Sequence, residues 1–126
     1  MKGSGKSAPV AWLEAPVEKN YLAAESYLAL AFDDADVARM LKALRAAPMA
    51  AFAAKDIFRA SGLSLLGVSN DQVEKFRRKI TQGEPLAPLL LLRAPALAKV
   101  LIADGYHRLC AVYGYDEDIA IPCRIA

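Results

Sequence analysis

The sequence is poor in several residues that carry common chemistry. Its 126 residues include one histidine, two cysteines and one tryptophan, and its formal net charge at pH 7 is only +2. Two cysteines are too few for the disulfide framework of a small secreted domain. A net charge this small gives no argument for a nucleic-acid partner. These counts therefore disfavour a disulfide-rich domain and a strongly basic nucleic-acid-binding protein.

Long hydrophobic runs are also missing. The longest, Leu89–Leu92, is far shorter than the about 20 apolar residues that a membrane-spanning helix needs. The chain does not open with the charged and then apolar segment of a secretory signal. With 56% hydrophobic and 24% charged residues, the composition is that of a globular protein. We expect no membrane association, a cytoplasmic location and reduced cysteines.

The chain is expected to form a single domain in three parts, which suits its length. Residues 1–10 are small, polar and glycine-rich, and predict a flexible tail. Within this tail, Gly5-Lys6-Ser7 matches only the end of a phosphate-loop motif, and we reject that interpretation. Residues 17–47 predict two helices, and residues 52–126 predict the core of the domain.

The second predicted helix has the clearest pattern of the first fifty residues. Four apolar residues at spacing i, i+3, i+4, i+7 form one stripe: Val37, Met40, Leu41 and Leu44. Asp33 and Asp34 precede it and can cap its start. The two helices together predict an N-terminal helical hairpin that packs on the rest of the chain.

The remaining segments predict a mixture of short helices and short strands. Ser69 with Gln72 fits a capping box for a helix that ends near Gly83. Pro122 indicates an edge strand or a strand start. The expected strands are Met49–Ala53, Leu89–Leu92 (buried on both faces), Val100–Ala103 (antiparallel to the one before) and Ile119–Ile125, with helices over 55–60 and 106–113, the latter ended by Gly114. The fold class is α+β, a compact domain with a small mixed sheet and the hairpin packed on it.

The stretch Asp104-Gly105-Tyr106-His107-Arg108 lies where a strand is expected to turn into a helix. The first backbone N–H groups of a helix have no partner within the helix, and the helix dipole places partial positive charge there. Glycine, histidine and arginine at this point predict a binding site for an anion, most often a phosphate. We identify Asp104, Gly105, Tyr106, His107 and Arg108 as candidate ligand-binding residues.

Each of these residues also has a structural alternative. His107 could make only a structural hydrogen bond, and Arg108 could pair with Asp104 or with an acid of residues 116–118 and brace the turn. Asp104 could simply cap the helix. Tyr106 could stack on a base, cover the site or pack. A metal site at His107, Cys110 and Cys123 is not expected, because their spacing is not diagnostic.

The helix after Ser69 adds a second basic feature. Gln72, Lys75 and Lys79 are spaced i, i+3, i+7 and share one face. Two lysines one turn apart repel each other unless an anion or a carboxylate lies between them. This face is either an ordinary solvated surface or a second wall of the anion site, and the spacing leaves both open.

Several segments in order resemble the ParB/sulfiredoxin superfamily. They are the motif at 83–88 before an apolar strand, the turn at 104–108, a short helix with small residues, and the final segment 121–125. The resemblance covers residues 52–126. It implies a compact α+β domain that binds a nucleotide, ATP or CTP, and it places Gln72, Lys75 and Lys79 on the phosphate side of their helix.

The chain also departs from both branches of that superfamily. Tyr106 stands where sulfiredoxins have their reactive cysteine, and a phenol cannot replace a thiolate nucleophile, so reductase activity is not expected. The ParB turn has Glu-Arg-Arg where this chain has Tyr106, His107 and Arg108. No helix-turn-helix domain follows, so we expect contact with nucleic acid only through a partner chain.

We therefore expect a domain that binds a nucleotide or another phosphorylated ligand, rather than an enzyme. One alternative is a non-catalytic protein-interaction module or DNA-partitioning accessory, whose hairpin docks on a partner or on a second copy to form a homodimer. Burial of the Val37–Leu44 stripe within one chain would count against hairpin docking. Another alternative is a phosphate-ester hydrolase or nuclease. The single histidine and the lack of paired carboxylates at metal-ligand spacing disfavour it.

Overall fold

The computed structural model describes residues 10–67 and 69–126, whose helices and strands form an α+β fold. Residues 1–9, which hold Gly5-Lys6-Ser7 and most of the expected tail, lie outside the described part, while Val10 is buried in the core. The described elements are α1 (Glu18–Leu28), α2 (Asp34–Ala46), β1 (Met49–Ala53), α3 (Ala54–Ser61), α4 (Asp71–Thr81), β2 (Leu89–Ala94), the 3-10 helix η1 (Pro95–Leu97), β3 (Lys99–Asp104), α5 (Tyr106–Tyr115) and β4 (Ala120–Ile125).

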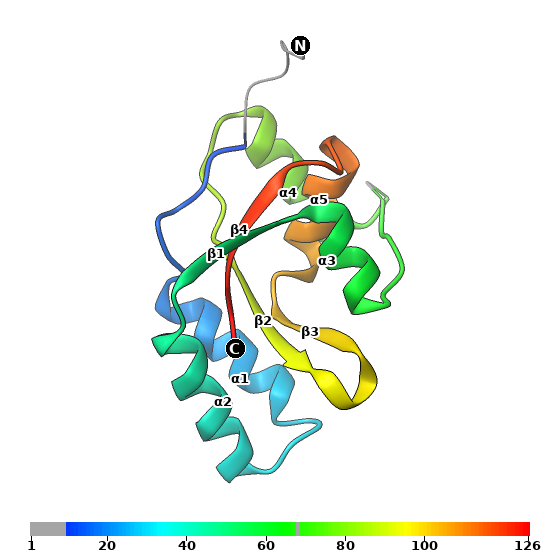
Figure 1. Cartoon of the computed structure of the whole chain (residues 1–126). Helices are drawn as coiled ribbons and strands as arrows, with labels where there is room; N and C mark the ends of the chain where they lie inside the picture. Colours follow the sequence, from blue (N-terminus) through cyan, green and yellow to red (C-terminus); the bar gives the residue numbers. More distant parts are fainter. Residues whose placement is uncertain (1–9, 68) are drawn as a thin grey trace.

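The four strands form one mixed sheet in the order β1-β4-β2-β3 (Figure 1). The outer pairs, β1 with β4 and β2 with β3, are antiparallel, whereas the two central strands β2 and β4 are parallel. The short connection after β2 fits the antiparallel pairing with β3, because parallel neighbours need a longer crossover. The predicted mixed sheet and the predicted antiparallel pair are confirmed.

Strand β2 is the centre of the molecule because both of its faces are buried. Leu89 and Leu91 pack into a core shared with α3, α4 and α5, and Leu90 and Leu92 pack into a second core shared with α1 and α2. Successive side chains of a strand point to opposite faces, so four leucines in a row serve two cores. Figure 1 shows α1 and α2 on one side of the sheet and the other three helices on the other side.

The N-terminal hairpin packs on the sheet as predicted. Val37 and Leu44 are buried in the second core, with Met40 and Leu41 partly buried against it. Asp33 caps α2, because its carboxylate accepts a hydrogen bond from the Asp36 N–H at 2.8 Å. The apolar stripe of α2 is therefore used within the chain and is not free to dock on a partner.

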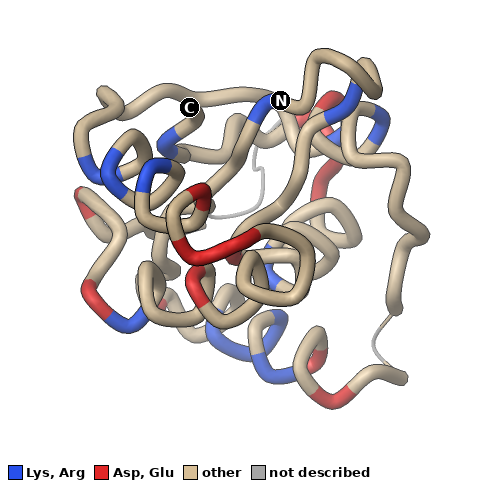
Figure 2. The backbone as a smooth tube through the Cα atoms, turned by 90° about the horizontal axis from the view of Figure 1, so that it is seen from below, with Lys and Arg blue, Asp and Glu red and all other residues tan. Residues whose placement is uncertain are grey.

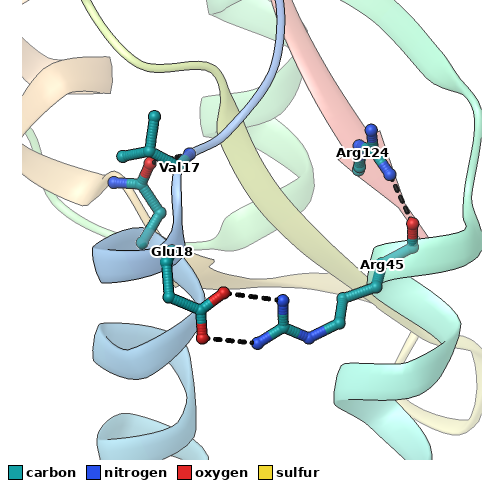
Figure 3. Close-up of polar contacts among 5 residues, drawn as sticks. Val17, Glu18, Arg45 and Arg124 are labelled. Carbon is teal, nitrogen blue, oxygen red and sulfur yellow. Dashed lines mark hydrogen bonds and ion pairs between the residues drawn. The ribbon is translucent and has the colours of Figure 1, made fainter.

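Polar contacts tie the hairpin together and to β4 (Figure 3). The guanidinium of Arg45 in α2 makes two hydrogen bonds of 2.9 Å to the carboxylate of Glu18 in α1. Arg124 of β4 donates to the main-chain oxygen of Arg45, at the end of α2. A cation at a helix C-terminus is favourable because the last carbonyl groups have no partner within the helix.

Three predicted details are wrong. The N-cap of α4 is Asn70 rather than Ser69, because the Asn70 side chain accepts hydrogen bonds from the N–H groups of Gln72 and Val73. Gly114 does not end α5, which continues to Tyr115. Pro122 lies in a central strand rather than at an edge, although the parallel ladder to β2 begins only at Cys123.

No helix in the described part of the chain is long and apolar enough to cross a membrane.

Candidate functional site

The predicted turn joins β3 to α5 through Gly105. Asp104 is the last residue of β3, Tyr106 is the first of α5, and Gly105 has a φ of 114°. A Cβ atom on Gly105 would lie 2.6 Å from Cγ of Leu89 and 3.0 Å from Nη2 of Arg108. Only glycine combines this backbone conformation with so close an approach. The turn therefore presses directly against the central strand.

Arg108 is buried, and its hydrogen bonds stabilise the turn from the protein interior. Its Nη2 atom donates to Oδ2 of Asp104 at 2.9 Å and to the main-chain oxygen of Pro88 at 3.2 Å. Its Nε atom donates to the main-chain oxygen of Ala87 at 2.9 Å. The side chains of Arg108 and Asp104 are only 8% and 15% exposed. Of the alternatives for Arg108, the structure shows the pairing with Asp104, and Asp104 pairs instead of capping α5.

Pro122 and one carbonyl that Arg108 contacts both lie just before the parallel ladder between β2 and β4. In the parallel pair, the N–H of Ala126 donates to the main-chain oxygen of Leu91 at 3.1 Å. This ladder begins where Leu89 lies opposite Cys123, so Ala87 and Pro122 both precede it. Proline has no N–H to donate. The part-buried carbonyl of Ala87 accepts a hydrogen bond from the guanidinium of Arg108 instead.

Tyr106 and Cys110 hold the loop between α3 and α4. The hydroxyl of Tyr106 donates to the main-chain oxygen of Ser64, and the N–H of Leu66 donates to Sγ of Cys110 at 3.5 Å. Burial raises the pKa of the Tyr106 phenol, and the neighbouring thiol of Cys110 raises it further. The side chain of Tyr106 is thus a neutral phenol at pH 7 that holds the loop in place.

Neither cysteine is placed for nucleophilic chemistry. Both are free and buried. Burial raises the pKa of the Cys110 thiol, and it raises the pKa of Cys123 to about 11. Because the thiolate is the reactive form, both thiols are inert at neutral pH.

The structure brings the two predicted basic features together around one aromatic ring. Nζ of Lys75 lies 5.7 Å from the centre of the Phe76 ring, Nζ of Lys79 lies 5.6 Å from it, and Cζ of Arg108 lies 5.9 Å from it. Distances of this size allow cation–π attraction. Neither lysine has a carboxylate partner among the described residues. We call Lys75, Lys79 and the start of α5 the basic corner.

The remaining predicted residues lie at the borders of this corner. No described side chain caps α5, so the first N–H groups of that helix have no side-chain acceptor. His107 is half-buried in the first turn, with its ring centre 5.4 Å from that of Tyr106. Gln72 is exposed one turn before Phe76, and the structure gives its side chain no specific contact among the described residues.

Sequence reasoning missed two features of this region. The spacing of the basic residues does not single out the ring of Phe76, which is the group that the cations share. A hollow of about 340 Å³ also lies between the loop, α4 and α5. Arg77 and Thr81 line it, on the flank of α4 away from Lys75 and Lys79. No pattern in the sequence marks the hollow, because a loop without regular structure forms one wall.

The charges and possible metal ligands give no further site. Lys and Arg are spread around the molecule among Asp and Glu (Figure 2). Within residues 10–67 and 69–126, the backbone view therefore shows no single basic face of the kind that would track a nucleic-acid backbone. Among residues 10–67 and 69–126, no group of three or more His, Cys, Asp or Glu side chains could hold a metal ion.

Comparisons with protein-family models, with curated proteins and with solved structures found no match to this chain. The fold and the site define its class as a compact α+β domain with an internally braced strand-to-helix turn beside a basic corner. The ParB/sulfiredoxin resemblance stays a prediction.

Proposed function

We propose that this protein binds a nucleotide or another phosphorylated ligand at the basic corner, as a ParB/sulfiredoxin-like domain without reductase activity. One observation carries the proposal. Lys75 and Lys79 of α4 and Arg108 of α5 surround the same Phe76 ring, beside the uncapped start of α5. Two basic features that are some thirty residues apart in the sequence thus meet at a helix N-terminus, which is a favourable place for a phosphate.

The contacts available to an anion can be divided between the backbone and the side chains. The N–H groups of Tyr106 and His107 lie in the first turn of α5, where the helix dipole favours negative charge. Lys75 and Lys79 supply two positive charges that no carboxylate of the described residues neutralises. The half-buried ring of His107 can donate a further hydrogen bond.

Arg108 has a different role in this proposal from the one its sequence context suggests. Asp104 already neutralises its charge, and the Nε and Nη2 atoms of Arg108 also donate to two main-chain carbonyls. Arg108 therefore holds the turn in place from the protein interior. The lysines and the backbone N–H groups of α5 face the ligand. This division resembles a preorganised anion site, in which fixed dipoles hold the charge without rearranging.

The side chains of the site suit the binding of a ligand better than catalysis. The phenol of Tyr106 is engaged with the loop, and both thiols are buried with raised pKa values. A hydrolase would need a general base or a metal centre near the bound phosphate. His107 is the one imidazole in the chain, and the basic corner offers it no carboxylate partner among the described residues.

Titration calorimetry with ATP, CTP and GTP tests the proposal. The double variant Lys75→Ala/Lys79→Ala is expected to bind about tenfold or more weakly than the wild type, a change of about 1.4 kcal/mol or more. The control Lys42→Ala/Arg78→Ala removes the same charge at exposed positions on α2 and α4 and should bind nearly as tightly as the wild type. Absence of binding for all three nucleotides, or equal weakening in both double variants, would contradict the proposal.

A further inference from the structure

The two edges of the sheet are protected very differently. At one edge, β3 begins with the exposed Lys99, contacts both α1 and α3, and has an irregular register with β2 near Leu90. At the other edge, β1 has the sequence Met-Ala-Ala-Phe-Ala, without a charged residue or a proline, and its register with β4 runs without a shift. Natural edge strands usually carry charges, prolines or bulges that prevent pairing. The outer edge of β1 has none of them.

The hydrogen-bond pattern shows which groups of β1 face outward. The N–H of Ala54 donates to the main-chain oxygen of Ile119 at 2.9 Å, directly after the last pair of the ladder, Ala53 opposite Ala120. Bonded pairs alternate along an antiparallel ladder, so Phe52 and Ala50 also bond toward β4. The N–H and C=O groups of Met49 and Ala51 therefore point away from the sheet, as does the N–H of Ala53, whose carbonyl begins α3.

The surface beside this edge is apolar. Met49 and Phe52 are 36% and 40% exposed, which is high for large apolar side chains. Phe52 also lines an apolar hollow of about 150 Å³ between α3 and the sheet, together with Ile57, Val100 and Ile125. An unpaired backbone edge and an exposed apolar surface thus coincide at β1.

We propose that the outer edge of β1 is a dimer interface, where it pairs antiparallel with β1 of a second copy of this chain. A two-fold axis at Ala51 would set the outward groups of Met49, Ala51 and Ala53 against those of Ala53, Ala51 and Met49 of the second copy. The same register places each Phe52 opposite Ala50 of the other copy, a large residue beside a small one. The pairing joins the two sheets into one continuous sheet.

A second copy fits this edge better than an unrelated strand because the edge is complementary to itself. The two Phe52 rings would lie on the same face as diagonal neighbours, within reach of each other across the strands. Each ring would cover the exposed face of the other and close the mouth of its hollow. The strand carries no charge, so no like charges oppose each other at the two-fold axis.

The molecular mass in solution tests this interface. Size-exclusion chromatography with light scattering should give about twice the single-chain mass of 13.6 kDa for the wild type. Ala51→Pro removes an outward N–H and leaves the bonds to β4 intact, so it should give the single-chain mass. Phe52→Asp places a charge at the interface and should do the same. The control Leu97→Asp changes an apolar residue that is 66% exposed on η1 and should stay dimeric.

Circular dichroism and a cooperative unfolding transition establish that each variant is folded. Phe52→Asp keeps the test valid if the proline variant does not fold, because its side chain is already partly in solvent. A wild type with the single-chain mass at every concentration would overturn the proposal. A dimer that survives both β1 variants, or one that Leu97→Asp disrupts equally, would overturn it as well.

Discussion

Replacing Gly105 by alanine is expected to lower the free energy of unfolding by about 4 kcal/mol, through backbone strain and overpacking together. The φ of 114° is unfavourable for any residue with a Cβ atom. The new Cβ would lie 2.6 Å from Cγ of Leu89, a fully buried residue of the central strand that cannot move aside. Urea denaturation followed by circular dichroism measures the loss.

Gly114→Ala is the matched control, nine residues further along the chain and within α5. Nothing lies within 4 Å of a Cβ atom there, and Gly114 is exposed inside α5. Alanine should therefore stabilise the protein by about 0.5–1 kcal/mol, because glycine is a poor helix former. Equal effects of the two substitutions would show that the turn at Gly105 is not packed against β2.

Replacing Arg108 by methionine is expected to lower the free energy of unfolding by about 3–5 kcal/mol, because it leaves a buried charge without its partner. The carboxylate of Asp104, whose side chain is 15% exposed, loses its ion pair. The carbonyls of Ala87 and Pro88 lose their donors as well. Thermal and urea unfolding of the purified variant give the measurement.

A double-mutant cycle separates the ion pair from the two carbonyl contacts. Asp104→Leu combined with Arg108→Met removes both charges and should destabilise the protein by less than the sum of the two single variants. The remaining loss measures the unpaired carbonyls of Ala87 and Pro88. A loss below about 1 kcal/mol for Arg108→Met alone, typical of an exposed ion pair, would contradict the bracing role.

Patterns of local spacing predicted the fold class and most of the elements. The stripe from Val37 to Leu44 gave the second helix of the hairpin and its buried face. The four leucines of β2 predicted a strand buried on both sides. These predictions succeeded because burial of a periodic apolar pattern is decided by residues close together in the sequence.

The role of Arg108 could not be read from the sequence. Its partners include the main-chain carbonyls of Ala87 and Pro88, about twenty residues away, and any residue type could present those groups. Pro122 predicts an edge strand or a strand start because proline has no N–H for a ladder, yet β4 is a central strand whose ladder to β2 begins only after this residue. The convergence of Lys75 and Lys79 with Arg108 on Phe76 depends on how α4 packs against α5, which spacing alone does not determine.

The most direct test of the basic corner is a titration of the ¹⁵N-labelled protein with ATP and with CTP, followed by NMR. Binding at the corner predicts concentration-dependent shifts of the backbone amides of Tyr106 and His107 and of the residues around Lys75 and Lys79. The amides of α1 and α2 should stay unchanged. Shifts confined to other surfaces, or no shifts with either nucleotide, would contradict the proposal that the start of α5 and the lysines of α4 hold a phosphate.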